Sequence, residues 1–170
     1  FILSLFPARY TEYITQKSSA IKEKMGYWLR GQLALCVIVG LLVYIGFIVI
    51  SLFYGKVEYA ATIAMVAGLT ELVPYAGPFI AWLIALPIIA NQSVVLIVWM
   101  TVLMYVVQML ENNFIVPVVM HKAVGISPIF IMFAMMVGFS FLGVLGMVLS
   151  VPVATALSIF FKDYATRAKS

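Results

Sequence analysis

Two long stretches of this sequence carry no formal charge, and they constrain the fold more than any other feature. Residues 72–110 and residues 123–161 each run for 39 residues without an Asp, Glu, Lys or Arg. As one straight helix, a stretch of that length would extend about 58 Å, roughly twice the thickness of the hydrocarbon core of a bilayer. Each stretch must therefore contain a break if it lies in a membrane.

The composition indicates that the chain does lie in a membrane. Hydrophobic residues make up 65% of the 170 residues and charged residues only 9%, which leaves too little polar surface for a water-soluble protein of this size. At roughly 20 residues per crossing, the length allows about four crossings of the lipid bilayer. The net charge of +4 comes from basic residues near the two chain ends, a topology signal that gives no reason to expect nucleic acid as a partner.

The first 30 residues hold seven of the 16 charged residues. They predict an amphipathic helix at the membrane interface, because apolar and aromatic side chains recur there at roughly helical spacing. Tyr27, Trp28 and Arg30 are typical of the headgroup region. We therefore assign residues 1–30 to an interfacial amphipathic segment and residues 31–170 to a transmembrane domain. We interpret Phe1 as an internal cut in a longer protein, since no initiator methionine or signal peptide precedes the helix.

The clearest span is 33–53, whose length of about 31 Å matches the hydrocarbon core. Proline and polar residues then predict two breaks, which leave segments 59–72, 79–90 and 93–110. The breaks are expected at Pro74, Gly77 and Pro78, and at Asn91 and Gln92. The stretch 123–161 is expected to break at Pro128, Gly138, Gly143, Gly146 and Pro152.

Long kinked spans and helical hairpins shielded by protein both satisfy these lengths. We favour hairpins, because segments 59–72 and 79–90 are too short to span alone. The order of span, hairpin, span and hairpin would be typical of an inverted repeat in a secondary transporter. Both arrangements return the C-terminal basic residues to the side of the N-terminal ones, which the positive-inside tendency makes cytoplasmic. The expected fold class is all-α, a polytopic membrane protein with two broken or hairpin-like helical regions.

The first candidate binding site surrounds Glu71. An acidic side chain beside a helix break, whose freed carbonyl groups also face inward, could hold a cation or a hydroxylated solute. The alternative is an interfacial glutamate that ends a helix near water. The break that accompanies Glu71 contains Pro74, Tyr75, Gly77 and Pro78.

The second candidate site gathers amide and carboxylate oxygens at the end of an apolar span. Helical spacing places Gln108, Glu111 and Asn112 on one face, so they could line a cavity together, whereas Asn113 points elsewhere. Oxygen ligands suit sodium ions, protons or polyols. The alternative is a polar cap where the span leaves the bilayer.

Other residues give little sign of chemistry. The single histidine, His121, lies beside Lys122 in a predicted loop and offers no metal-ligand set. Cys36 is the only cysteine, so neither a disulfide framework nor a cysteine metal site can form within one chain. No His-Glu-x-x-His motif occurs, and no nucleophile is paired with a base. The sequence therefore predicts neither a cofactor nor enzymatic activity.

Five motifs resemble the autoinducer-2 exporter (AI-2E) family in order and spacing, and together they cover nearly the whole chain. They are RGQL at 30–33, ELVPYAGP at 71–78, LENNFIVP at 110–117, VGISP at 124–128 and FLGVLGMVLSVP at 141–152. The resemblance implies that this is the C-terminal part of a bacterial inner-membrane transporter that exports small hydrophilic molecules such as autoinducer-2. It also implies a homo-oligomer, with a pentamer as one possibility.

Two rival functions stay open at this point. Some relatives are associated with sodium or lithium and proton exchange, so the resemblance also implies a cation antiporter as an alternative. A membrane scaffold without transport activity is the second alternative. Under either transport function, the resemblance places Glu71 with its helix break and Glu111 with its neighbouring amides at the site.

Overall fold

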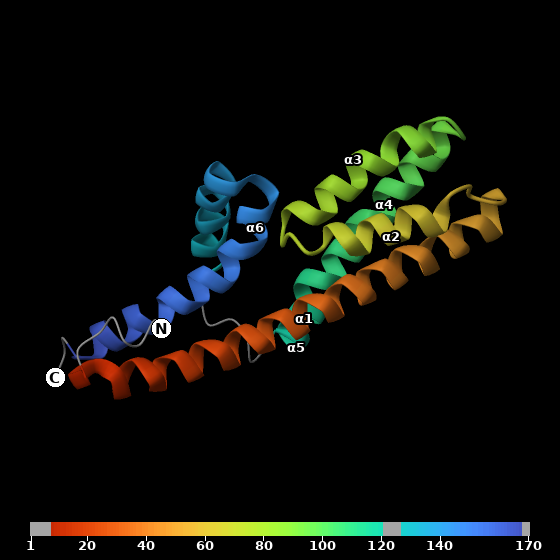
Figure 1. The fold of residues 1–170 in the computed structure, drawn as a ribbon. Coiled ribbons are helices and arrows are strands. Elements are labelled where there is room, and N and C mark those ends of the chain that lie inside the picture. Colours follow the sequence, from red (N-terminus) through yellow and green to blue (C-terminus); the bar gives the residue numbers. More distant parts are fainter. Residues whose placement is uncertain (1–7, 121–126, 168–170) are drawn as a thin grey trace. The chain divides into compact units, whose positions relative to one another are not determined.

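The computed structural model describes residues 8–120 and 127–167, and the elements in these ranges are helices (Figure 1). The expected all-α class is confirmed. The chain divides into two compact units, one of residues 30–121 and one of residues 1–29 with 122–170, and we describe each by itself. In chain order the helices are α1 (Ala8–Tyr54), α2 (Ala60–Thr70), α3 (Ala76–Ala90), α4 (Val94–Leu110), η2 (Glu111–Ile115), α5 (Val116–Val119) and α6 (Pro128–Arg167).

Within the described residues, three helical stretches are long and apolar enough to cross a bilayer, namely Ser18–Tyr54, Val94–Val119 and Ile129–Ser158. The first contains the predicted span 33–53. Helix α1 continues through residues 27–30 without interruption, so the expected interfacial segment and the first span form one helix. Residues 1–7 of that segment lie outside the described residues, as do His121 and Lys122. The depth at which α1 enters the bilayer stays a prediction.

Helices α2 and α3 form the first predicted hairpin. With 11 and 15 residues, both are shorter than a membrane crossing needs, and they lie side by side in Figure 1. The chain turns between them at residues 71–75. Gly77 and Pro78 do not interrupt a helix but belong to the first turn of α3, where a missing backbone donor costs nothing.

The second predicted break, at Asn91 and Gln92, separates α3 from α4. There the Oγ of Ser93 accepts a hydrogen bond from the backbone N–H of Val95 at 3.2 Å. A serine in this position caps one of the free N–H groups at a helix start. Gln92 links this connection to the loop before α2. Its Oε1 accepts a hydrogen bond from the N–H of Glu58 at 2.9 Å, and its Nε2 donates one to the carbonyl of Glu58 at 3.2 Å.

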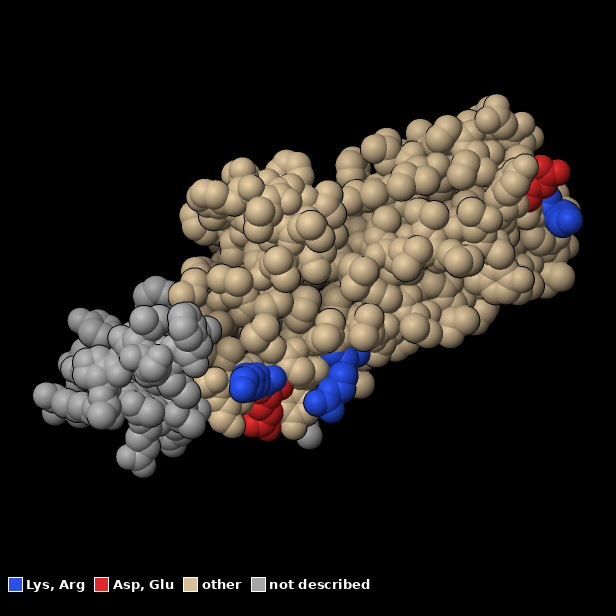
Figure 2. Space-filling view, in the orientation of Figure 1, with Lys and Arg blue, Asp and Glu red and all other residues tan. Residues whose placement is uncertain are grey.

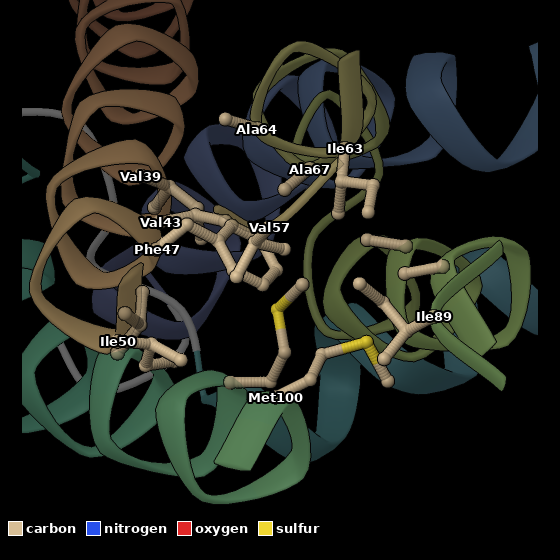
Figure 3. Close-up of a cluster of buried hydrophobic side chains, with 14 residues drawn as sticks. Val39, Val43, Phe47, Ile50, Val57, Ile63, Ala64, Ala67, Ile89 and Met100 are labelled. Atoms are coloured by element: carbon tan, nitrogen blue, oxygen red, sulfur yellow. The ribbon is translucent and has the colours of Figure 1, made fainter. Parts of the chain in front are cut away.

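An apolar core joins four helices of the unit that spans residues 30–121 (Figure 3). Val43 and Phe47 of α1 are almost completely buried, and they share this core with Ile63 of α2, Ile89 of α3 and Met100 of α4. Because lipid does not drive apolar helices together, such contacts stabilise the unit through close packing. Two glycines, Gly40 on α1 and Gly68 on α2, bring these two backbones into contact.

Helix α6 contains the second predicted hairpin. Gly143 is its one residue with a non-helical backbone, at φ 60° and ψ −139°, and the helix reverses there. The expectation of further breaks at Gly138 and Gly146 is wrong. Both are helical, and a Cβ atom at either would lie within 2.3 Å of the other's carbonyl oxygen, so they pack the two arms together. Pro152 lies inside the second arm, which continues through it.

The surface fits a lipid environment. Many large apolar side chains of α4 and α6, among them Val94, Tyr105, Phe133 and Phe141, are more than half exposed. Figure 2 shows a face without charge apart from a few small groups of acidic and basic side chains. An exposed apolar surface of this extent would promote aggregation in water and indicates contact with lipid.

Candidate functional site

Glu71 lies where α2 ends. It is only 1% exposed, and its Oε2 atom has no hydrogen-bond partner among the described residues. The backbone N–H of Glu71 completes α2 by bonding to the carbonyl of Ala67 at 3.2 Å. A buried carboxyl oxygen without a partner is costly, and in a membrane protein it is a functional hypothesis by default.

Gln32 of α1 reaches the same point from the other side. Its Nε2 donates a hydrogen bond to the backbone carbonyl of Glu71, and its side chain is also 1% exposed. This carbonyl belongs to the last turn of α2, where helix geometry leaves acceptors without partners. Our sequence reasoning placed no role on Gln32. The available signal was a polar amide at the start of an otherwise uncharged span, inside the motif at 30–33.

The turn after Glu71 is strained. Tyr75 has φ 64° and ψ −40°, and the N–H of Ala76 bonds to the carbonyl of Pro74 at 2.8 Å. This geometry is a γ-turn with positive φ, which is rare and strained for a residue other than glycine. The Tyr75 side chain is 46% exposed, so the residue reaches the candidate site through its backbone alone.

Gly77 permits the close approach of the two hairpin helices. A Cβ atom there would lie 2.3 Å from the carbonyl oxygen of Thr70 and 2.9 Å from the Cα of Glu71. The start of α3 therefore rests directly on the end of α2, which a larger residue would prevent. Pro74 and Pro78 flank this contact and are partly buried.

Glu111 lies at the start of η2, a π-helical turn within the span Val94–Val119. It is 5% exposed and its Oε2 accepts a hydrogen bond from the Nε2 of Gln108 at 3.2 Å. Pro117 explains the wide turn, because its ring would clash with the carbonyl four residues earlier in a regular α-helix. The N–H of Val116 bonds instead to the carbonyl of Glu111. Such π-turns are frequent at functional sites.

The structure does not bring the two asparagines to this pair. Asn112 and Asn113 are both exposed, and the Nδ2 of Asn113 bonds to the carbonyl of Met109 at 2.8 Å. The expected shared face holds for Gln108 and Glu111 but not for Asn112. The wider turn of η2 shifts the register after Glu111, which α-helical spacing does not anticipate.

The side chains of Glu71 and Glu111 are both buried, and both belong to the unit of residues 30–121. Two short helices and a π-turn thus place two acidic side chains in the same apolar unit. Among the residues that the structure describes, no group of three or more His, Cys, Asp or Glu side chains could hold a metal ion. Carboxyl oxygens are suited in chemistry to a cation or to the hydroxyl groups of a polar solute.

Comparison with known proteins agrees with a transport role. Residues 1–166 match the family model described as AI-2E family transporter. The chain belongs to the AI-2E transporter family. Similar members include three candidate transport proteins of Bacillus subtilis (strain 168). YrrI is 30% identical over 82% of the chain, YueF 28% over 94% and YtvI 29% over 98%.

The chain spans 38% of YrrI, 42% of YueF and 43% of YtvI, so it corresponds to less than half of each of these AI-2E relatives. No solved structure gives a significant match. The match places the chain in a family of transporters. It does not identify the solute or the direction of transport.

Proposed function

We propose that this chain is the C-terminal part of a bacterial inner-membrane exporter of small hydrophilic molecules, such as the autoinducer-2 signal. Both ends of the chain would lie in the cytoplasm. The observation that carries the proposal is Glu71, a buried carboxyl group with an unpartnered oxygen at the junction of two helices too short to cross the bilayer. Discontinuous helices of this kind form the solute sites of secondary transporters.

The α2–α3 hairpin supplies the second requirement of alternating access, which is an element that can move. Its turn contains Tyr75, whose strained backbone a movement of the hairpin could relax. Its polar backbone is shielded by α1 through Gln32, as a hairpin tip at membrane depth requires. A solute with hydroxyl groups would bind to the carboxyl groups of Glu71 and Glu111, and a movement of the hairpin would change the side from which they are reached.

The test uses the full-length protein in lipid vesicles with autoinducer-2 as the solute. Glu71→Gln and Glu111→Gln each remove one acceptor charge and should lower export by about tenfold or more, as expected for a lost charged hydrogen bond. Glu58→Gln is the matched control, because Glu58 is an exposed glutamate in the connection before α2. The site assignment fails if both buried variants export the solute like the wild type.

A sodium or lithium and proton antiporter is the second candidate function. It is favoured by the presence of two buried acidic side chains in one unit, because a bound cation would offset the cost of burying their negative charge. In the same vesicles, an imposed sodium or proton gradient should drive counter-flux only if this function holds. Export of the solute without any response to either gradient would exclude the antiporter.

A scaffold without transport activity predicts a different result. Cysteine substitutions at residues 72–78, in a protein whose Cys36 has been replaced, should react with aqueous thiol reagents from one or both sides if the hairpin lines a path. Residues that stay unreactive from both sides would favour the scaffold. As partners we propose the lipid bilayer, the solute, and further copies of the same chain in a homo-oligomer, whose size cross-linking in the membrane would give.

A further inference from the structure

We infer that Gln32 is a positioning residue of the carboxylate site, and that its hydrogen bond to the Glu71 carbonyl holds the Glu71 carboxyl group in place. This inference rests on the proposed function, because it assigns a role within that same site. The sequence predicts no site role for Gln32 or for any other residue of α1. The juxtaposition that carries the inference is one side-chain amide and one backbone carbonyl, 39 residues apart in the chain and both buried.

The carbonyl of Glu71 needs a donor from outside its own helix. The residue three positions later, Pro74, has no backbone N–H to donate. The N–H groups of Ala76 and Gly77 bond to the carbonyls of Pro74 and Val73, both at 2.8 Å. The Gln32 amide is the donor that the structure supplies for the Glu71 carbonyl. Because backbone groups at membrane depth must find partners within the protein, this bond ties the turn of the hairpin to α1.

The adjacent residue, Gly31, places α1 against a second part of the same unit. A Cβ atom on Gly31 would lie 2.8 Å from the Sδ of Met120 and 3.4 Å from the carbonyl oxygen of Val119. Residues 31 and 32 of α1 therefore touch both regions that supply the carboxyl groups: Gly31 meets the end of α5, which follows η2, and Gln32 meets the end of α2. Loss of the amide would free the turn that carries Glu71 while α1 keeps its contact with α5.

The titratable groups around this position are few among the described residues. They are Glu71 on the hairpin, Glu111 on η2, and Cys36, which lies one helical turn along α1 and whose backbone carbonyl faces Gly68 of α2. Arg30 precedes the position on α1. A carboxyl group placed at residue 32 can donate a hydrogen bond to the Glu71 carbonyl only while it is protonated, and its ionised form would be repelled by that oxygen.

The experiment compares Gln32→Leu, which has no donor, with Gln32→Glu, whose donor depends on pH. Both variants are made in the full-length protein, and export is measured relative to the wild type at each pH. Gln32→Leu should lower export by about tenfold at every pH, the loss expected for an unpaired buried carbonyl. Gln32→Glu should show the same loss at neutral pH and recover as the pH falls.

Gln92→Leu and Gln92→Glu are the matched controls. Gln92 also bonds a backbone carbonyl, that of Glu58, but it lies beyond the C-terminal end of α3, at the opposite end of the hairpin from Glu71. Both control variants should retain export and an unchanged pH profile. An equal loss in the Gln92 variants, or a flat pH profile for Gln32→Glu, would overturn the inference, because either result would reduce Gln32 to a general packing contact.

A second measurement does not depend on transport. Dicyclohexylcarbodiimide reacts with carboxyl groups in apolar surroundings, and mass spectrometry gives its rate of attachment to Glu71. The rate should rise several-fold in Gln32→Leu and stay unchanged in Gln92→Leu. If the rate changes as expected but the wild type moves no solute, the proposed function fails and the positioning role stands. An unchanged rate in Gln32→Leu overturns the positioning role, including in a protein that transports.

Discussion

Gly68 on α2 lies so close to Cys36 on α1 that a Cβ atom at Gly68 would meet the Cys36 carbonyl oxygen at 2.6 Å. Gly68 also faces Gly40 on α1. A Cβ atom at Gly68 would lie 3.4 Å from the Cα of Gly40, and one at Gly40 would lie 3.6 Å from the Cα of Gly68. Small residues that let two backbones touch are a common device of membrane helices. Here they hold α2, and with it the hairpin, against the first span.

Gly68→Ala should therefore destabilise the protein by about 1–3 kcal/mol, the range for overpacking a close contact. The added methyl group would meet backbone, which can yield only if α2 moves away from α1. The measurement is thermal unfolding of the purified protein in detergent.

Gly46→Ala is the comparison for that prediction. Its Cβ would meet the side-chain end of Leu103 at 2.1 Å, but that leucine can change its rotamer. We expect the smaller loss of stability in Gly46→Ala. The opposite order would mean that the contact between α1 and α2 yields more easily than the packing of Leu103.

The turn in α6 depends on Gly143 for a different reason. Open space surrounds its Cα, but its backbone has φ 60° and ψ −139°, which side chains other than hydrogen strongly disfavour. Gly143→Ala should cost about 1–3 kcal/mol, measured by thermal unfolding. Ser140→Ala in the same hairpin is the control and should change stability by less than about 0.5 kcal/mol. A tolerated Gly143→Ala would contradict the tight turn.

The membrane class, the all-α fold and the first hairpin could be predicted because length and polarity decide them. Segments too short to cross a bilayer must turn back, and Pro74 with Asn91 marks where they do so. The second hairpin was harder to place. Glycine both breaks helices and packs them together, so the sequence alone does not distinguish Gly143, which turns the chain, from Gly138 and Gly146, which join the arms.

The candidate site was predicted in part for a related reason. Local spacing places Gln108 beside Glu111, three residues apart on one helix. It does not reveal that Pro117 widens the next turn and leaves Asn112 exposed. Gln32 escaped notice because its partner is a backbone carbonyl far away in the chain, and a contact of that kind leaves no periodic pattern.

The strain at Tyr75 can be measured by two substitutions at that position. Tyr75→Gly removes both the side chain and the penalty for positive φ, whereas Tyr75→Ala removes the side chain alone. Because the side chain is 46% exposed, its loss should matter little in either variant. We expect Tyr75→Gly to unfold at a higher temperature than Tyr75→Ala, by about 1 kcal/mol in stability. Equal stability of the two variants would show that the turn relaxes when the tyrosine is lost.

A hydrogen bond between two helices offers a further test of the hairpin. The Nε1 of Trp82 on α3 donates to the Oγ1 of Thr101 on α4 at 3.0 Å. A double-mutant cycle with Trp82→Phe and Thr101→Val should give a coupling energy of about 0.5–1.5 kcal/mol. Thermal unfolding of the wild type, the two single variants and the double variant supplies the four values. A coupling energy of zero would indicate that α3 and α4 separate at this point in detergent.

We expect the Glu71 side chain to lower the stability of the protein. Its buried Oε2 has no partner among the described residues, so an acidic group is costly at this position, and Glu71→Gln, which cannot ionise, should raise stability by about 1 kcal/mol. Glu111→Gln keeps an oxygen that can accept the hydrogen bond from Gln108 and should change stability by less than about 0.5 kcal/mol.

Both variants should lose export. In Glu71→Gln the unfolding temperature should therefore rise while transport into vesicles falls. Such a trade of stability for activity is typical of functional residues. If Glu71→Gln instead unfolded at a lower temperature than the wild type, the Glu71 carboxylate would have a stabilising partner in the full-length protein, and its assignment as an open binding group would be wrong.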